Sequence, residues 1–147
     1  MSTDDIHPPR AYRDPDYMNS AAGRPLRILA EYLGPQERFA EHNIEDTILL
    51  FGSARLLPWS EAKRRLEKAE ADAGDLVKAQ VDLKMSRYYE DTREFAFRLT
   101  EWSKALSDKR RRFVIFSGGG PETMEAANRG ASEAKGGNIG LGISLPT

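Results

Sequence analysis

The segment Phe113-Val114-Ile115-Phe116-Ser117-Gly118-Gly119-Gly120-Pro121 joins a short apolar run to three consecutive glycines. Its two aromatic and two β-branched residues predict a buried strand. The glycines let the chain turn sharply and leave no side chain between the backbone and a ligand. Pro121 suits the first turn of a helix, which we expect to continue to about Lys135. Strand, turn and helix N-terminus together predict a backbone cradle for an anion such as phosphate.

Two further apolar runs predict strands on either side of this one in the sequence. Residues 47–52 form a continuous apolar run, and residues 138–144 follow the glycine pair that closes the predicted helix. Continuous apolar runs are typical of strands covered on both faces, as in parallel sheets. We therefore expect an α/β fold with parallel strands near 47–52, 113–117 and 138–144, flanked by helices.

A long helical insertion, about residues 58–107, separates the first two predicted strands. Residues 58–73 are strongly charged and helical in pattern, and Gly74-Asp75 breaks that helix and caps the next. From 76 to 107 apolar residues recur at steps of three and four, which predicts one amphipathic helix of about 30 residues, ~45 Å long. We expect an extended crossover that covers the sheet and contributes to a subunit interface.

The N-terminal region shows weaker signals. Residues 1–23 are rich in Asp, Pro, Arg and Ser without an apolar period, which predicts a flexible arm. A strap that docks on a partner subunit is the alternative. Next, a short helix is predicted to stop at Gly34-Pro35. One face of that helix carries Leu26, Leu29 and Leu33.

The four basic residues at 109–112 come directly after the long helix. As a nucleic-acid patch the run is too short to be persuasive. We expect these cations instead to oppose the dipole at the helix C-terminus.

Composition bounds the possible functions. The 147 residues suit one domain, and 22 basic against 23 acidic residues give a net charge of −1, which favours neither nucleic acid nor an anionic membrane. The chain has no cysteine, and its only histidines are His7 and His42, so a metal site is not expected. No apolar run approaches the ~20 residues of a membrane span, and no signal peptide is visible. A cytoplasmic protein is expected.

The glycine turn and the residues after it resemble a known family. Ser117-Gly-Gly-Gly-Pro-x-x-Met124-Glu-Ala-Ala-Asn-Arg-Gly130-Ala, then Gly136-Gly-x-Ile139-Gly-Leu-x-Ile143-x-Leu145-Pro, resembles the first signature of the LOG (Lonely Guy) family. Residues 51–55, Phe-Gly-Ser-Ala-Arg, match the end of the first strand in its larger bacterial branch. The resemblance covers roughly residues 24–146 and implies a Rossmann-like domain.

The resemblance also implies an activity. Characterised LOG proteins hydrolyse the N-glycosidic bond of nucleoside 5′-monophosphates, such as AMP or cytokinin ribotides, to free base and ribose 5-phosphate. No cofactor or metal is implied. The label "lysine decarboxylase", often given to the family, finds no support, because no lysine here has a recognisable pyridoxal-phosphate context. The implied partners are a nucleoside monophosphate and further copies of the chain, in a homodimer or higher homo-oligomer.

The resemblance points to two segments as phosphate- or ribose-binding. Both lie at carboxyl ends of predicted strands, where open α/β sheets bind ligands. The candidate residues are Gly52, Ser53 and Arg55 after the first strand, and Ser117, Gly118, Gly119 and Gly120 in the glycine turn. Taken without the family match, Ser53 is more simply a turn residue and Arg55 a surface ion pair.

Two carboxylates near the turn bear on catalysis. Glu125 is a candidate catalytic carboxylate, although helix-dipole stabilisation explains it as well. Glu122 departs from the glycine usual in the family, and its charge would repel a phosphate. The family's catalytic arginine and glutamate, and its second signature Pro-Gly-Gly-x-Gly-Thr-x-x-Glu, do not occur in this sequence.

A sheet of only three parallel strands would leave an apolar edge unpaired and one face poorly covered. We therefore expect residues 24–147 to be the N-terminal part of a larger LOG-type domain, active only in the full-length protein. The alternative is a non-catalytic nucleotide-binding or carrier module, which suits both the missing signature and Glu122.

Overall fold

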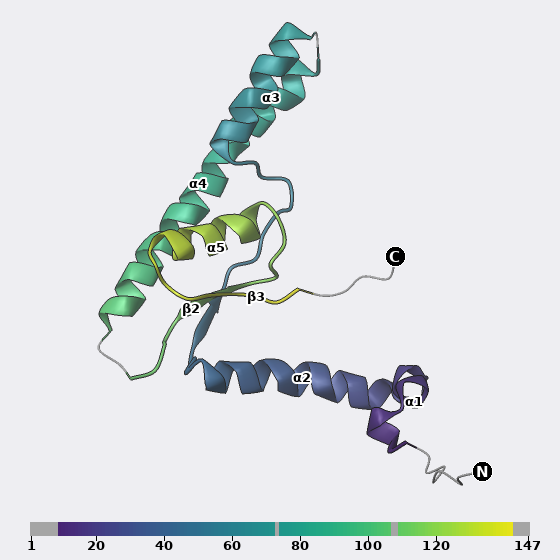
Figure 1. The fold of residues 1–147 in the computed structure, drawn as a ribbon. Coiled ribbons are helices and arrows are strands. Elements are labelled where there is room, and N and C mark those ends of the chain that lie inside the picture. Colours follow the sequence, from purple (N-terminus) through teal and green to yellow (C-terminus); the bar gives the residue numbers. More distant parts are fainter. Residues whose placement is uncertain (1–8, 73, 107–108, 143–147) are drawn as a thin grey trace, which may run out of the picture. The chain divides into compact units, whose positions relative to one another are not determined.

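The computed structural model describes residues 9–72, 74–106 and 109–142. The chain forms two compact units, Met1–His42 and Asn43–Thr147. The first unit holds the 3₁₀ helix η1 (Ala11–Arg13), α1 (Pro15–Asn19) and α2 (Arg24–Glu41). The segment predicted to be a flexible arm thus carries two short helices, and residues 1–8 lie outside the described part of the chain. The second unit holds all the strands and the remaining helices (Figure 1).

The helix α2 is longer than predicted. The sequence predicts a stop at Gly34-Pro35, but the helix continues through Pro35 to Glu41. Proline removes one intrahelical hydrogen bond, yet the residues after it are mostly strong helix formers, so the helix resumes. None of its residues is buried, and most of its large apolar side chains, including Leu29 and Tyr32, are exposed.

The second unit contains a three-stranded parallel sheet, which confirms the predicted α/β class. Its strands are β1 (Thr47–Leu49), β2 (Val114–Ser117) and β3 (Asn138–Gly140), in the order β1-β2-β3. Ile48 pairs with Ile115, and Phe116 with Ile139. The strands are shorter than the apolar runs that predicted them. Beyond Leu49 the Leu50 N–H still donates a hydrogen bond to the carbonyl oxygen of Phe116 at 2.9 Å. Residues 143–147 lie outside the described part.

Three helices accompany the sheet: α3 (Trp59–Ala71), α4 (Leu76–Ala105) and α5 (Thr123–Glu133). The predicted long helix is therefore confirmed, and so is its cap, because Asp75 Oδ1 accepts a hydrogen bond from the Lys78 N–H at 2.9 Å. In Figure 1, α3 runs back along α4, and α5 packs against both α4 and the sheet.

The core joins α4 and α5 to the sheet face that carries Ile115. Small side chains dominate it, so the two helices approach closely. The cluster consists of Ala96, Ile115, Ala127 and Ala131, with Leu50 and Leu99 packed against it. At Gly130 the approach is closest, because a Cβ built there would lie 2.0 Å from the carbonyl oxygen of Arg93. On the opposite sheet face, Leu49 is exposed and Phe116 is half-buried.

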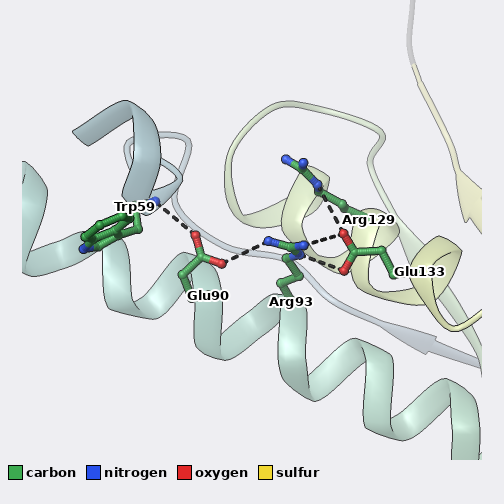
Figure 2. Close-up of polar contacts among 5 residues, drawn as sticks. All are labelled: Trp59, Glu90, Arg93, Arg129 and Glu133. Atoms are coloured by element: carbon green, nitrogen blue, oxygen red, sulfur yellow. Dashed lines mark hydrogen bonds and ion pairs between the residues drawn. The ribbon is translucent and has the colours of Figure 1, made fainter. Parts of the chain in front are cut away.

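A polar network ties the three helices together (Figure 2). Arg93 makes a bidentate pair with Glu133, with Nε at 2.8 Å and Nη2 at 2.5 Å from the carboxylate oxygens. Glu90 contacts Arg93 at 3.3 Å and accepts a hydrogen bond from the Trp59 N–H at the first turn of α3. The hydrogen bonds from Arg93 hold the pKa of Glu133 below its usual value. Bidentate geometry makes this pair more than a casual surface contact.

The basic run follows the end of α4, as the sequence predicts, and two of its side chains have acidic partners on another segment. α4 ends at Ala105, and Leu106 is extended. Arg112 pairs with Asp46 at 2.7 Å and Arg110 with Glu45 at 3.7 Å. These pairs join the segments that precede β1 and β2, because the parallel alignment of the strands brings those segments together.

Candidate functional site

The glycine turn after β2 is held by the buried hydroxyl of Ser117. Its Oγ accepts hydrogen bonds from the Gly119 N–H at 3.1 Å and from the Asn128 Nδ2 at 2.8 Å. Ser117 is fully buried, and the backbone of Gly119 takes the left-handed value φ +66°. The Ser117 hydroxyl and the Gly119 N–H thus bind each other and stabilise the turn. The Ser117 hydroxyl faces the interior rather than a ligand.

Close neighbours explain why this turn needs glycine. A Cβ on Gly140 would lie 3.2 Å from the Cα of Gly119, so the ends of β2 and β3 meet backbone to backbone. A Cβ on Gly120 would lie 2.5 Å from the Met124 Cε, and one on Gly118 would lie 3.0 Å from its Sδ. The flexible end of the Met124 side chain therefore lies beside Gly118 and Gly120, whereas Gly119 is exposed. The glycines thus accommodate protein atoms on one side of the turn.

The helix after the turn begins two residues later than predicted. α5 starts at Thr123, and Pro121 lies outside it. Between them Glu122 occupies φ 62° and ψ −113°, a conformation that glycine adopts readily and L-residues rarely do. Its Oε2 is buried and has no hydrogen-bond partner among the described residues, and no side chain caps the helix. The departure from glycine at this position is thus accompanied by backbone strain.

Replacing Glu122 with glycine should therefore stabilise the protein by about 1 kcal/mol, because relief of the positive φ outweighs the added flexibility of the unfolded chain. Urea unfolding followed by circular dichroism measures the change. Glu125→Gly is the matched control, because Glu125 is exposed within α5 and loses about 1 kcal/mol of helix propensity. A fall in the midpoint for both variants would contradict strain at Glu122.

The second predicted segment, Gly52 to Arg55, meets the start of α5. The Thr123 Oγ1 donates a hydrogen bond to the carbonyl oxygen of Ser53 at 2.9 Å, across 70 residues of sequence. A Cβ on Gly52 would lie 2.6 Å from the Thr123 Cγ2, so glycine is needed for this contact. The carboxyl end of β1 and the N-terminus of α5 are thereby fastened together.

Beside this junction lies a cleft of about 520 Å³, which we call the β1 cleft. It combines the segment that follows β1, the first residue of α5 and the N-terminal half of α4. Its lining residues are Gly52, Ser53, Arg55, Leu56, Val81, Asp82, Met85, Tyr88 and Thr123. The wall from α4 is largely apolar, and the opposite side carries backbone and polar groups. Clefts with this division suit ligands that have both a flat apolar part and a charged part.

Charge and aromatic surface are both available in the β1 cleft. Arg55 is exposed, and no carboxylate among the described residues pairs with it, contrary to the surface ion pair considered from the sequence. Asp82 faces Lys78 at 4.0 Å, which offsets its charge. Tyr88 is 42% exposed, and the Arg87 guanidinium lies 4.6 Å from the centre of its ring.

Glu125 belongs to a different part of the molecule. It does not line the β1 cleft, and it lies near Tyr89 and Arg129 where α4 and α5 pack together. Burial raises the pKa of Tyr89, Arg129 opposes that rise, and the charge of Glu125 adds to it. The described residues therefore favour the helix-dipole explanation of Glu125 over a catalytic one.

Sequence reasoning missed six residues of the cleft: Leu56, Val81, Asp82, Met85, Tyr88 and Thr123. From the sequence, Met85 and Tyr88 are only positions in the apolar stripe of the long helix, and Thr123 does not stand out. A small hydroxyl residue in the first turn of a helix is the one signal that points to Thr123. Nothing in the sequence shows that the stripe of α4 passes the end of β1, because that depends on packing.

Sequence comparison adds no assignment: no family model matches the chain, and a search of curated proteins finds no relative. Among the described residues, no helix is long and apolar enough to cross a membrane. Within the same part of the chain, no three His, Asp or Glu side chains are placed to hold a metal ion.

Proposed function

We propose that the β1 cleft binds a nucleoside 5′-monophosphate, as part of an N-glycosidic hydrolase of the LOG type. The supporting observation is the Thr123–Ser53 hydrogen bond, which makes Arg55 and the uncapped N-terminus of α5 neighbours of one cleft. The phosphate would bind to Arg55 and to the start of α5 at Thr123, because a guanidinium and a helix N-terminus both favour an anion, and their attraction must exceed the repulsion from the Glu122 carboxylate. The base would stack on Tyr88 from the apolar wall.

The proposed arrangement accounts for binding and orientation of the substrate. Hydrolysis of an N-glycosidic bond also needs a carboxylate to activate water or to stabilise an oxocarbenium-like centre. Asp82 is the carboxylate that lines the β1 cleft, but it already faces Lys78. The contact between Asp82 and Lys78 favours the second candidate, a nucleotide-binding module without catalysis.

Titration of AMP into the full chain by calorimetry tests the binding step. Arg55→Gln should weaken AMP binding about tenfold, since one charge-assisted hydrogen bond is lost. Tyr88→Leu should weaken it by a comparable factor through lost stacking. Arg98→Gln is the matched control, because Arg98 is exposed on α4, pairs with Glu94 and does not line the cleft. Equal affinity in all four proteins would place the nucleotide elsewhere.

Chromatographic detection of adenine in the same samples tests for hydrolysis. Adenine released from AMP by the wild-type chain, and lost in Arg55→Gln, would support the hydrolase and reject the binding module. Saturable AMP binding without adenine release agrees with both candidates, because the family's catalytic arginine and glutamate do not occur in this sequence. The absence of both AMP binding and adenine release would reject both candidates.

A further inference from the structure

A second pocket lies at the amino end of β2, whereas the β1 cleft lies beyond the carboxyl end of β1. It has a volume of about 310 Å³ and is formed where the end of α4 and the end of α5 meet the chain entering the sheet. Among the described residues, every ionisable side chain that lines it is basic: Lys104, Arg110, Arg111, Arg112 and Lys135. We call it the basic pocket.

Three of these cations have partners that hold the pocket together. Arg110 and Arg112 pair with Glu45 and Asp46. The Lys104 ammonium contacts Glu101 and donates to the carbonyl oxygen of Ala134 at 2.7 Å. These contacts fix the rim, so the pocket is a built feature of the fold rather than a loose surface.

The other two cations, Arg111 and Lys135, have no carboxylate partner among the described residues. Arg111 lies over the backbone of Gly137, because a Cβ there would be 3.3 Å from its Nη1. Lys135 comes after α5 in the left-handed conformation, with φ 54°. Two unpaired positive groups facing one small pocket repel each other unless an anion lies between them.

An independent observation comes from Thr100, which is only 5% exposed and lines the same pocket. The methyl group of Thr100 packs against Gly136, where a Cβ would lie 2.0 Å from the Thr100 Cγ2. Its Oγ1 is buried and has no hydrogen-bond partner among the described residues. Buried hydroxyls are nearly always hydrogen-bonded, so an unpartnered one in a pocket wall points to a ligand.

We propose that the basic pocket binds a small phosphate-bearing anion, which accepts hydrogen bonds from the Arg111 guanidinium, the Lys135 ammonium and the Thr100 hydroxyl. Phosphate suits three donors that approach from separate elements, because it offers several acceptor oxygens and close to two negative charges. A nucleic-acid backbone suits the pocket less well, because it needs a basic groove longer than one small pocket. This site is separate from the β1 cleft, and its occupation does not depend on the function proposed there.

Titration of inorganic phosphate into the full chain, followed by phosphorus NMR at constant ionic strength, tests the proposal. We expect saturable binding with a Kd of about 1 mM. Arg111→Gln and Lys135→Asn should each weaken binding about tenfold, and asparagine tolerates the left-handed backbone at 135. Thr100→Val keeps the packing on Gly136 and should weaken binding several-fold without lowering the melting temperature.

Arg98→Gln is the control and should bind phosphate as the wild-type chain does, because Arg98 pairs with Glu94 and lines neither the basic pocket nor the β1 cleft. Near-ultraviolet circular dichroism of each variant shows that the fold is kept. Absence of saturable binding, or unchanged affinity in Arg111→Gln or in Thr100→Val, would overturn the proposal. So would tight binding of a single-stranded oligonucleotide that phosphate does not displace.

Discussion

Replacing Gly130 with alanine is expected to destabilise the second unit by about 3 kcal/mol or more, because the new Cβ overlaps backbone atoms that cannot rotate away. It would lie 2.0 Å from the carbonyl oxygen of Arg93 and 3.1 Å from the Cβ of Ala96. α4 and α5 would have to separate, which loosens the alanine-rich core and the Arg93–Glu133 pair. Loss of this size is a large part of the stability of a small domain. Urea unfolding measures the loss in the free energy of unfolding.

The sign of this change in stability is informative, because a glycine-to-alanine substitution inside a helix normally stabilises a protein by about 1 kcal/mol. Gly142→Ala serves as the control, since a Cβ there meets nothing within 4 Å, and its unfolding midpoint should hardly change. A midpoint for Gly130→Ala at or above that of the wild type would show that α5 does not rest on the backbone of Arg93.

Replacing Gly119 with valine is expected to cost about 2–3 kcal/mol, because a β-branched residue is strained at φ +66°. The strain falls on the turn that Ser117 holds and that lies against Gly140, so the ends of β2 and β3 should loosen together. The same urea experiment measures the loss of stability in Gly119→Val, with Gly142→Val as the control. A midpoint equal to the wild type would show that the left-handed conformation at 119 is not required.

This second prediction changes how a loss of AMP binding would be interpreted. The glycine turn invites substitution of Gly119 as a test for phosphate binding. Because Gly119 has a positive φ and its backbone lies against Gly140, such a variant would lose affinity through disturbed folding. Arg55→Gln and Arg111→Gln are better probes, since each removes only a charge at an exposed side chain. Loss of AMP affinity in Arg111→Gln alone would move the nucleotide phosphate to the basic pocket.

Most elements of the second unit could be predicted from the sequence, because their signals are local. The run from 113 to 117 and the steps of three and four along α4 identify a strand and a long helix by period alone. Asp75 is predicted as a cap and is one. The boundary errors are also local in origin. Pro35 predicts the end of a helix, but the helix formers after it let α2 continue to Glu41. Pro121 predicts the start of a helix, but α5 begins at Thr123.

The candidate site was predicted only in part. Gly52, Ser53 and Arg55 do line one cleft, and the glycine turn does sit between β2 and α5. The turn, however, packs on Met124 and Gly140, and the hydroxyl of Ser117 faces inward. Glycines that admit a ligand and glycines that admit protein atoms look alike in a sequence, because both report only the absence of a Cβ.

The α/β class, the parallel order of strands and helices, and the length of α4 could all be inferred from the sequence, since apolar period and capping act between near neighbours. Which distant groups share a site depended on the folded chain. The Thr123–Ser53 hydrogen bond and the meeting of Thr100 with Arg111 at one pocket join residues far apart in the chain. Such contacts arise from how the helices pack on the sheet, and no local pattern encodes that packing.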